Sequence, residues 1–422
     1  MFRSHLAPSA ADSKQPTYDL TGWNEATTRV DRSRMETVAV HAGRDDLHEL
    51  GVHALPIDLS STYRLDDLSR SGESLEAMAL GGHPQGSPVY SRLYNPTVAR
   101  FEQALATLES AEESVAFSSG MAGITAVLIA VRQQGTHVVA VRPLYGGTDH
   151  LLASGLLGLE VSWARPEEVR AAMRPDTSLV LLETPANPTL ALVDLETIVR
   201  DAGSVPVAVD NTFATPILQN PIHHGATFVI HSATKFLGGH GDVLAGVVAT
   251  DRHWASELRK VRVITGNVLH PLAAYLLHRG LPTLPMRVRA SQETASYLAE
   301  RIEKHPAVKA VHYPGMAPSC VDTRVLTAQM RGPGGILAFE VHGGFDAATS
   351  ILASVKLMTP AVSLGSVDTL IQHPAALTHR VVESSAREQS GISSSLMRIS
   401  AGLENAHDLW SDLRQALERA QA

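Results

Sequence analysis

Short apolar runs alternate with helical patterns through the middle of the chain. Segments whose apolar residues recur at helical spacing predict helices at 98–112, 121–135, 146–158, 166–175 and 195–203. Runs rich in Val, Ile and Leu predict strands at 113–117, 137–143, 159–164, 178–185, 205–211 and 227–235. Strands that are apolar on both faces and alternate with helices indicate a mainly parallel sheet that helices cover on both sides.

The pattern changes after this region. A long helix is predicted at 287–305, a strand at 334–341 and a terminal helix at 406–420. These mixed elements predict a smaller C-terminal α+β domain at 287–422, beside a large α/β domain at 94–286.

The first part of the chain lacks such periodicity. Residues 1–34 are polar and predict a flexible arm, and nothing in them resembles the apolar core of a signal peptide. Residues 66–88 are rich in Gly and Ser and predict a long loop.

Composition narrows the class of protein. The chain has 422 residues, of which 44% are hydrophobic and 18% charged, as in globular proteins of more than one domain. The net charge of −8, without a block of Lys or Arg, argues against nucleic-acid and membrane partners. A single cysteine allows no internal disulfide, which favours a cytoplasmic location. The histidines show no metal-site spacing, so we expect no metal.

Polar residues that follow the predicted strands are the candidates for chemistry, because ligands of open α/β sheets bind at the carboxyl ends of the strands. Ser118–Gly123 precede an apolar helix, whose free N–H groups could hold a phosphate, although Ser119 could also be an ordinary helix cap. Asp210 ends an apolar strand, where a charge is costly unless a cation pairs with it. An Asx turn is the alternative interpretation.

Lys235 follows the next strand, beside the hydroxyl groups of Ser232 and Thr234. A lone lysine is usually a solvated charge, but here it could bind phosphate or form a Schiff base with an aldehyde. Tyr145, after the strand at 137–143, could stack on a flat ring or simply cover the sheet edge. These four features match the parts of pyridoxal 5′-phosphate (PLP): a phosphate seat, a carboxylate, an amine and an aromatic ring.

Three motifs at these positions, HSATKFLGGHGD, VDNTFATP and SSGMAGI, resemble those of the PLP-dependent enzymes of cysteine and methionine metabolism, the trans-sulfuration family. The resemblance extends from about Glu36 to Ala420. It implies the aminotransferase-like fold type I, a catalytic Lys235 that bonds to the cofactor, and a pairing of Asp210 with the pyridine nitrogen. It also implies cofactor contacts from Gly120, Met121, Tyr145, Ser232 and Thr234.

Further motifs extend the resemblance. YSRLYNPT implies that Tyr90 and Arg92 bind the phosphate of a neighbouring subunit, which makes residues 1–93 an N-terminal arm and inter-subunit segment of a homotetramer built from two dimers. ETPANP places Asn187 near cofactor and substrate. AVSLGSVDTLIQHP and LMRISAGLEN imply that Ser363 and Arg398 bind the substrate carboxylate.

The resemblance implies γ-elimination from methionine, homocysteine or cystathionine, with Lys235 as the base and Tyr145 as the acid. The products would be 2-oxobutyrate, ammonia and a thiol. The alternative is γ-replacement, by an O-acylhomoserine sulfhydrylase or a cystathionine synthase, and Gly147 stands where methionine γ-lyases carry a cysteine. A nicotinamide-dependent dehydrogenase would need a G-x-G-x-x-G motif after the first strand, which the sequence lacks.

Overall fold

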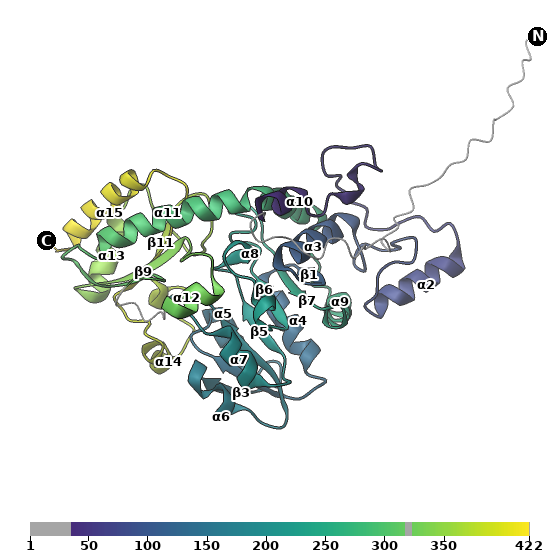
Figure 1. Ribbon diagram of the computed structural model, residues 1–422, viewed down its shortest axis with the longest axis horizontal. Coiled ribbons are helices and arrows are strands. Elements are labelled where there is room, and N and C mark those ends of the chain that lie inside the picture. Colours follow the sequence, from purple (N-terminus) through teal and green to yellow (C-terminus); the bar gives the residue numbers. More distant parts are fainter. Residues whose placement is uncertain (1–34, 317–322, 422) are drawn as a thin grey trace, which may run out of the picture.

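The computed structural model describes residues 35–316 and 323–421, which form two β-sheets and the helices packed on them (Figure 1). The larger sheet has seven strands in the order β1-β7-β6-β5-β4-β2-β3. Its strands are β1 (Glu113–Phe117), β2 (His137–Val141), β3 (Glu160–Ala164), β4 (Thr177–Glu183), β5 (Val207–Asp210), β6 (Phe228–His231) and β7 (Gly246–Thr250). The predicted mainly parallel sheet is confirmed.

Strand β7 is the exception to the parallel arrangement. It runs antiparallel to both neighbours, with Val229 opposite Ala249 on one side and Phe117 opposite Gly246 on the other. The sequence analysis did not predict this strand, whose apolar run of five residues follows a glycine-rich loop. The segment that joins β6 to β7 therefore leaves the sheet at the carboxyl end of β6 and returns at that same end.

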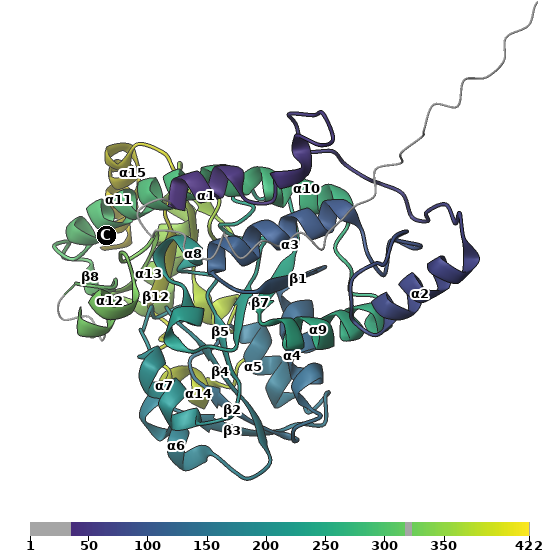
Figure 2. The same cartoon turned by 45° about the vertical axis from the view of Figure 1, so that its right-hand side comes forward.

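Helices cover both faces of the large sheet (Figure 2). On one face, side chains of α4 and α9 pack against β1, β4 and β6, and on the other, α7 packs against β4 and β5. The helices of this part are α3 (Pro96–Glu109), α4 (Gly120–Val131), α5 (Gly146–Ala153), α6 (Val169–Ala172), α7 (Leu195–Ala202), α8 (Thr215–Leu218), α9 (Arg252–Thr265) and α10 (Pro271–Gly280). Short 3-10 helices lie at Asp45–Leu47, Pro166–Glu168, Pro221–His224, Leu281–Thr283 and Pro374–Ala376.

The smaller sheet lies at the left of Figure 1, in the order β10-β11-β12-β9-β8. Its strands are β8 (Val308–His312), β9 (Ile336–Val341), β10 (Thr359–Pro360), β11 (Leu370–Gln372) and β12 (Leu396–Ser400). Apolar side chains of this sheet share a core with the three longer helices near it. The helices here are α11 (Leu284–Ile302), α12 (Thr323–Gln329), α13 (Gly344–Ser354), α14 (Ser384–Gln389) and α15 (Ala406–Gln421).

Among the described residues before α3 lie the α-helices α1 (Met35–His41) and α2 (Leu68–Ala79). The long loop predicted for 66–88 is therefore wrong over its first half. The side chain of Asp67 caps α2 by accepting a hydrogen bond from the N–H of Arg70, and Met78 is buried against Leu93 and Val263. Gly and Ser obscured this helix in the sequence. The arm predicted for residues 1–34 lies outside the described residues.

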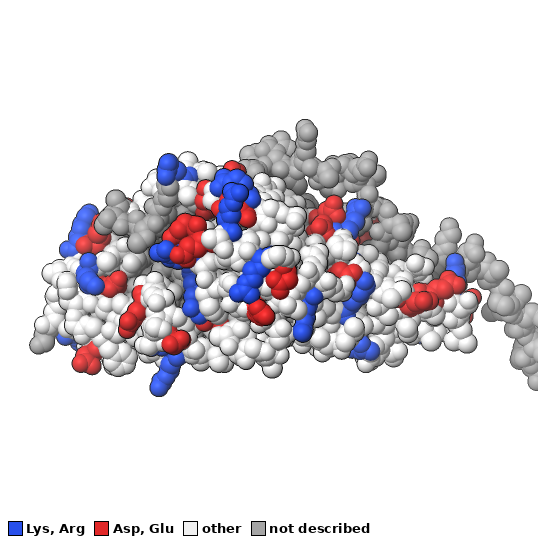
Figure 3. Space-filling model, turned by 90° about the horizontal axis from the view of Figure 1, so that it is seen from below, with Lys and Arg blue, Asp and Glu red and all other residues white. Residues whose placement is uncertain are grey.

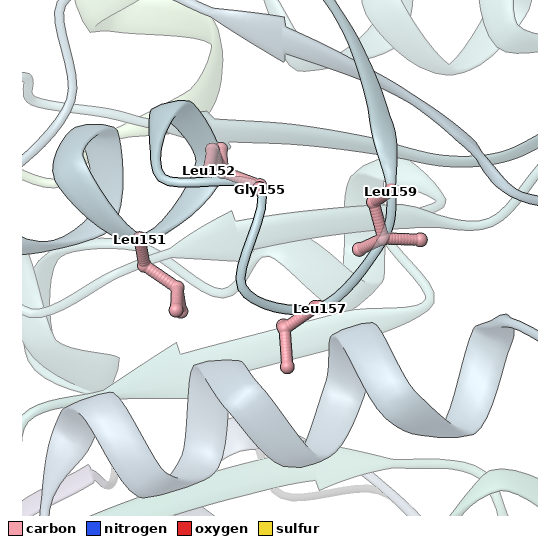
Figure 4. Close-up of a pocket in the computed structure, with 5 residues that line it drawn as sticks. All are labelled: Leu151, Leu152, Gly155, Leu157 and Leu159. Carbon is pink, nitrogen blue, oxygen red and sulfur yellow. The ribbon is translucent and has the colours of Figure 1, made fainter.

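Within the described residues, no helix combines the length and the apolar character that a bilayer span requires. On the face shown in Figure 3, Lys and Arg side chains are interspersed with Asp and Glu, so neither sign of charge dominates it. A small hollow between α5 and β3 is lined by leucines and Gly155 (Figure 4). It lies at the amino end of β3 and offers no polar side chain, so it is a packing defect rather than a site for chemistry.

Candidate active site

The predicted site residues gather at the carboxyl edge of the large sheet. Because the strands concerned run parallel, the residues that follow them meet at one edge. These residues are Tyr145 after β2, Asn187 after β4, Asp210 at the end of β5, and Ser232, Thr234 and Lys235 after β6. The smaller sheet contributes Ser363, before β11, and Arg398, in β12.

A chain of hydrogen bonds joins the lysine to the arginine. The Nζ atom of Lys235 donates to Oγ of Ser363 at 2.6 Å, and Nη2 of Arg398 donates to the carbonyl of the same serine at 2.6 Å. Nη1 of Arg398 donates to Oδ1 of Asn187 at 2.8 Å. Side chains that are far apart in the sequence, and belong to two sheets, thus form one connected group.

Two cations lie within this group, and their surroundings change both side chains. Burial, and after it the positive charge of Arg398, lowers the pKa of Lys235 to about 8. Burial also lowers the pKa of Arg398 to about 10, so its guanidinium stays charged at neutral pH. A lysine with such a pKa is partly neutral near physiological pH, as a base or a nucleophile must be.

Ser363 is held in an unusual backbone conformation. Its φ of 92° lies in the left-handed region, which residues other than glycine rarely adopt. Such strain persists only where surrounding contacts maintain it, and it is common at functional sites. Here the bonds from Lys235 and Arg398 hold both the hydroxyl and the carbonyl of the serine.

The lysine is positioned by the glycine-rich loop that follows it. Gly239 has a φ of 76°, and a Cβ atom there would lie 2.1 Å from Nη1 of Arg287. That guanidinium donates to the carbonyls of Phe236 at 2.6 Å and Gly280 at 2.8 Å. A side chain at residue 239 would displace Arg287, so the glycine allows a buried arginine to fix the loop next to Lys235.

Asp210 is a partly buried carboxylate held by Thr212, a residue to which the sequence analysis gave no role. Thr212 donates to Oδ1 of Asp210 from its N–H at 3.0 Å and from Oγ1 at 2.5 Å. The same hydroxyl accepts from the N–H of Ser232 at 2.8 Å. Burial raises the pKa of Asp210, while the Thr212 bonds and the charge of His231 oppose the rise. A cationic group that contacts the carboxylate would therefore stabilise it.

The start of α4 forms a compact seat beside Ser232. Ser119 caps the helix by accepting from the N–H of Ala122 at 3.1 Å, which leaves the N–H groups of Gly120 and Met121 at the free end of the helix. A Cβ atom at Gly120 would lie 3.1 Å from Cβ of Ser232. The glycine thus lets helix end and serine approach, as an anion between them requires.

Glu183 is a second acidic residue at the site, and the sequence analysis gave it no role. It is the last residue of β4, opposite Asp210 in the register of the sheet, and it is 5% exposed. Its carboxylate accepts from the N–H of Tyr145 at 2.8 Å and from the N–H of Asn187 at 2.9 Å. The signal was present, because Glu183 follows an apolar run just as Asp210 does.

Three predicted residues have contacts elsewhere. The hydroxyl of Thr234 donates to the carbonyl of Ala245 at 3.2 Å. Arg92 donates to the carbonyl of Val263 at 2.6 Å and lies over the ring of Tyr90, which is 44% exposed. The structure therefore does not join Tyr90 and Arg92 to the Lys235 group within one chain.

An amine with a lowered pKa, a partly buried carboxylate and a helix N-terminus at the carboxyl edge of such a sheet define a PLP-dependent enzyme of fold type I. A model of the family described as "Cys/Met metabolism PLP-dependent enzyme" matches residues 36–418. The chain belongs to this family.

Curated relatives and solved structures agree with this assignment. The chain is 55% identical over 391 residues to an L-methionine gamma-lyase of Brevibacterium sandarakinum, covering 92% of this chain and 98% of the relative. It is 54% identical over 385 residues to an L-methionine gamma-lyase of Streptomyces avermitilis, covering 91% and 89%. The crystal structure of cystathionine gamma synthase from Xanthomonas oryzae pv. oryzae in complex with cystathionine superposes with a TM-score of 0.84 at 36% identity, covering 92% and 98%.

The residues at the site fit PLP. The raised pKa of Asp210 marks a carboxylate that lacks full compensation for burial, as expected where a protonated ring nitrogen pairs with it. The close packing of Gly120 on Ser232 provides N–H groups and a hydroxyl where a phosphate needs them. Lys235, with its lowered pKa, has the amine that bonds to an aldehyde.

Proposed function

We propose that this protein is a γ-lyase that acts on L-methionine and releases 2-oxobutyrate, ammonia and methanethiol, with one water consumed. The observation that carries the proposal is the connected group of Lys235, Ser363, Arg398 and Asn187, together with 55% identity to an L-methionine gamma-lyase over 92% of the chain. Homocysteine and cystathionine, which carry sulfur at the same carbon, are further candidate substrates.

Each residue has a distinct task in this proposal. Bound PLP supplies an electron sink for the pair left when a proton leaves the substrate. Arg398 binds the α-carboxylate by two parallel hydrogen bonds and so orients the Cα–H bond toward Lys235. The neutral amine of Lys235 takes the proton from Cα, gives it up again within the complex of cofactor and substrate, and, once neutral, takes a second proton from Cβ. Tyr145 donates a proton to the departing sulfur, and Asp210 holds a proton on the ring nitrogen.

Gly120, Met121, Ser232 and Thr234 bind the phosphate in this proposal, and Asn187 contacts both cofactor and substrate. Ser363 contributes a hydroxyl to the carboxylate site.

We further propose a homotetramer of two dimers in which Tyr90 and Arg92 complete the site of the neighbouring subunit. Large apolar side chains of the same N-terminal segment are exposed in the single chain, including Leu59 at 64% and Leu68 at 81%, as expected for a surface that a partner covers. The same proposal includes domain limits at residues 93 and 286. It also includes a cytoplasmic location. Light scattering and cell fractionation test the assembly and the location.

A substrate panel tests the reaction. We expect 2-oxobutyrate from L-methionine, homocysteine or cystathionine without any added nucleophile. The competing function is γ-replacement, which is favoured by the likeness to a cystathionine gamma synthase. Gly147, in place of the cysteine of methionine γ-lyases, bears on which sulfur amino acid is the substrate. Release of the oxo acid only from O-acetylhomoserine, suppressed by added sulfide, would reject the lyase and support replacement.

Lys235→Ala tests the role of the amine. The variant should bind the amino acid and lose turnover, and retention of near-normal turnover would contradict the proposal.

A further inference from the structure

We propose that Glu183 is a positioning residue that ties the Tyr145 turn to the Asn187 turn and thereby fixes the carboxylate-binding arginine. This inference deepens the proposed function and depends on it only for the role of Arg398.

One carboxylate connects two turns of the site. Glu183 ends β4, while Tyr145 follows β2 and Asn187 follows β4. Oε2 of Glu183 accepts from the N–H of Tyr145 at 2.8 Å, and Oε1 accepts from the N–H of Asn187 at 2.9 Å. Because each oxygen holds a different turn, this side chain links the two turns beyond the point where the pairing of β2 with β4 ends.

The tether extends to the arginine through Asn187. The side chain of Asn187 accepts from Nη1 of Arg398, and its main-chain N–H is held by Glu183. The guanidinium is further oriented by the carbonyl of Ser363 and by the amide oxygen of Gln372, which accepts from Nη2 at 2.6 Å. Loosening Asn187 therefore removes one of the contacts that aim Arg398 at the substrate.

The Tyr145 turn depends on the same carboxylate. Tyr145 is 38% exposed, and its main-chain N–H is held by Glu183. The ring also covers Gly147, where a Cβ atom would lie 2.6 Å from Cε1 of the ring. A shift of the Tyr145 main chain would move the phenol that the proposed mechanism uses as an acid.

Only a carboxylate fits this arrangement. Two N–H donors require two acceptors, and a glutamine of the same shape would present one oxygen and one NH2 group. The NH2 group would face an N–H donor, so one of the two turns would lose its tether. Burial and the neighbouring charge of Asp210 both raise the pKa of Glu183, a destabilising placement of the kind expected where a side chain serves the site.

Glu183→Gln tests the proposal, with Asp412→Asn as the matched control. Asp412 is likewise buried, at 6% exposure, and accepts from the N–H groups of Lys356, Leu357 and Met358 near α15. Both substitutions replace a carboxylate oxygen that accepts from main-chain N–H groups, so both should lower the thermal midpoint of unfolding. Only Glu183 lies at the site.

The measurement is the dissociation constant of L-norleucine for the holoenzyme. Binding is monitored through the change in the visible absorbance of the cofactor. Norleucine has the shape of methionine with a methylene group in place of sulfur, so it binds without elimination. We expect Glu183→Gln to raise this constant on the order of tenfold, because one charge-assisted hydrogen bond is lost. Asp412→Asn should leave it within about twofold of the wild type.

A constant within about twofold of the wild type in Glu183→Gln would overturn the proposal, as would an equal rise in both variants. If the Gln variant does not fold, Glu183→Asp is the second test. It keeps both acceptor oxygens, but its shorter side chain should not reach both N–H groups at once, so wild-type norleucine affinity in that variant would overturn the proposal equally. Should the wild type release no 2-oxobutyrate from methionine while Glu183→Gln still weakens norleucine binding, the lyase assignment fails and the role of Glu183 stands.

Discussion

Lys235 destabilises the folded chain in the absence of cofactor, and its removal should be measurable as a gain in stability. Burial and the charge of Arg398 lower its pKa from 10.5 to about 8. At about 1.36 kcal/mol for each pH unit, the charged amine is about 3 kcal/mol less favourable in the fold than in water. Lys235→Met removes the charge and also loses the hydrogen bond to Ser363, which contributes about 1 kcal/mol. The cofactor-free variant should therefore be more stable by about 2 kcal/mol near neutral pH.

The free-energy penalty of the charged Lys235 depends on pH, and the difference between its folded and unfolded pKa values gives the direction of the change. Below a pH of about 8, the lysine is protonated in both the folded and the unfolded chain, and the fold carries the full penalty. Between about 8 and 10.5, the unfolded chain binds more protons, so the stability of the wild type rises with pH. The gain in stability of the Lys235→Met variant over the wild type should shrink through this pH window. Above the window the variant should be slightly less stable than the wild type.

Urea unfolding of the cofactor-free proteins, at equal protein concentration, measures the difference. Lys260→Met is the control, because Lys260 is a half-exposed residue paired with Glu257 at 2.6 Å, and its loss should change stability by at most about 1 kcal/mol. A Lys235→Met variant that is less stable than the wild type near neutral pH, or an advantage that is constant up to a pH of about 10.5, would refute the reasoning.

Further substitutions test the other parts of the site. Arg398→Lys loses the two-point contact with the substrate carboxylate, so KM for the amino acid should rise roughly 10- to 100-fold with a smaller change in kcat, whereas an unchanged KM in steady-state kinetics would contradict that contact. Arg92→Ala should lower PLP affinity more in dilute than in concentrated protein, and titrations that give equal affinity at both concentrations would count against a contact across subunits. Gly146→Ala places a Cβ atom 2.1 Å from the carbonyl oxygen of Thr378, so thermal unfolding should show a loss of about 1–3 kcal/mol, and full stability would show that the two segments separate easily.

The sequence predicted the large sheet well because its strands are apolar on both faces and alternate with amphipathic helices. It failed at β7 and α2, where local composition gave the wrong signal. The five residues of β7 follow a glycine-rich loop, and their partners β1 and β6 are distant in the sequence. The helix α2 contains Gly72 and several serines, and it depends on the Asp67 cap and on the burial of Met78. Both β7 and α2 therefore form because of tertiary contacts that local composition does not show.

The site shows the same division. Lys235 and Asp210 could be predicted because each interrupts the apolar pattern at the end of a strand. Glu183 does the same and begins the ETPANP motif, but only the structure shows that it joins Tyr145 to Asn187. Thr212 lies in the VDNTFATP motif, but its contacts with Asp210 and Ser232 form only where β5 and β6 lie side by side, so the sequence did not show its role.

The reversed strand β7 has a consequence for how this protein tolerates change. It pairs with β6, which leads to Lys235, and with β1, which leads to Gly120, so the main-chain ladder sets the separation of the amine from the helix end. Substitutions at the exposed residues Asp242 and Leu244 leave that ladder intact, and a library that varies them should yield many folded members, whereas Val243 between them is buried in the core. Deleting one residue from β7 would turn its side chains to the opposite face and shift both functional groups together.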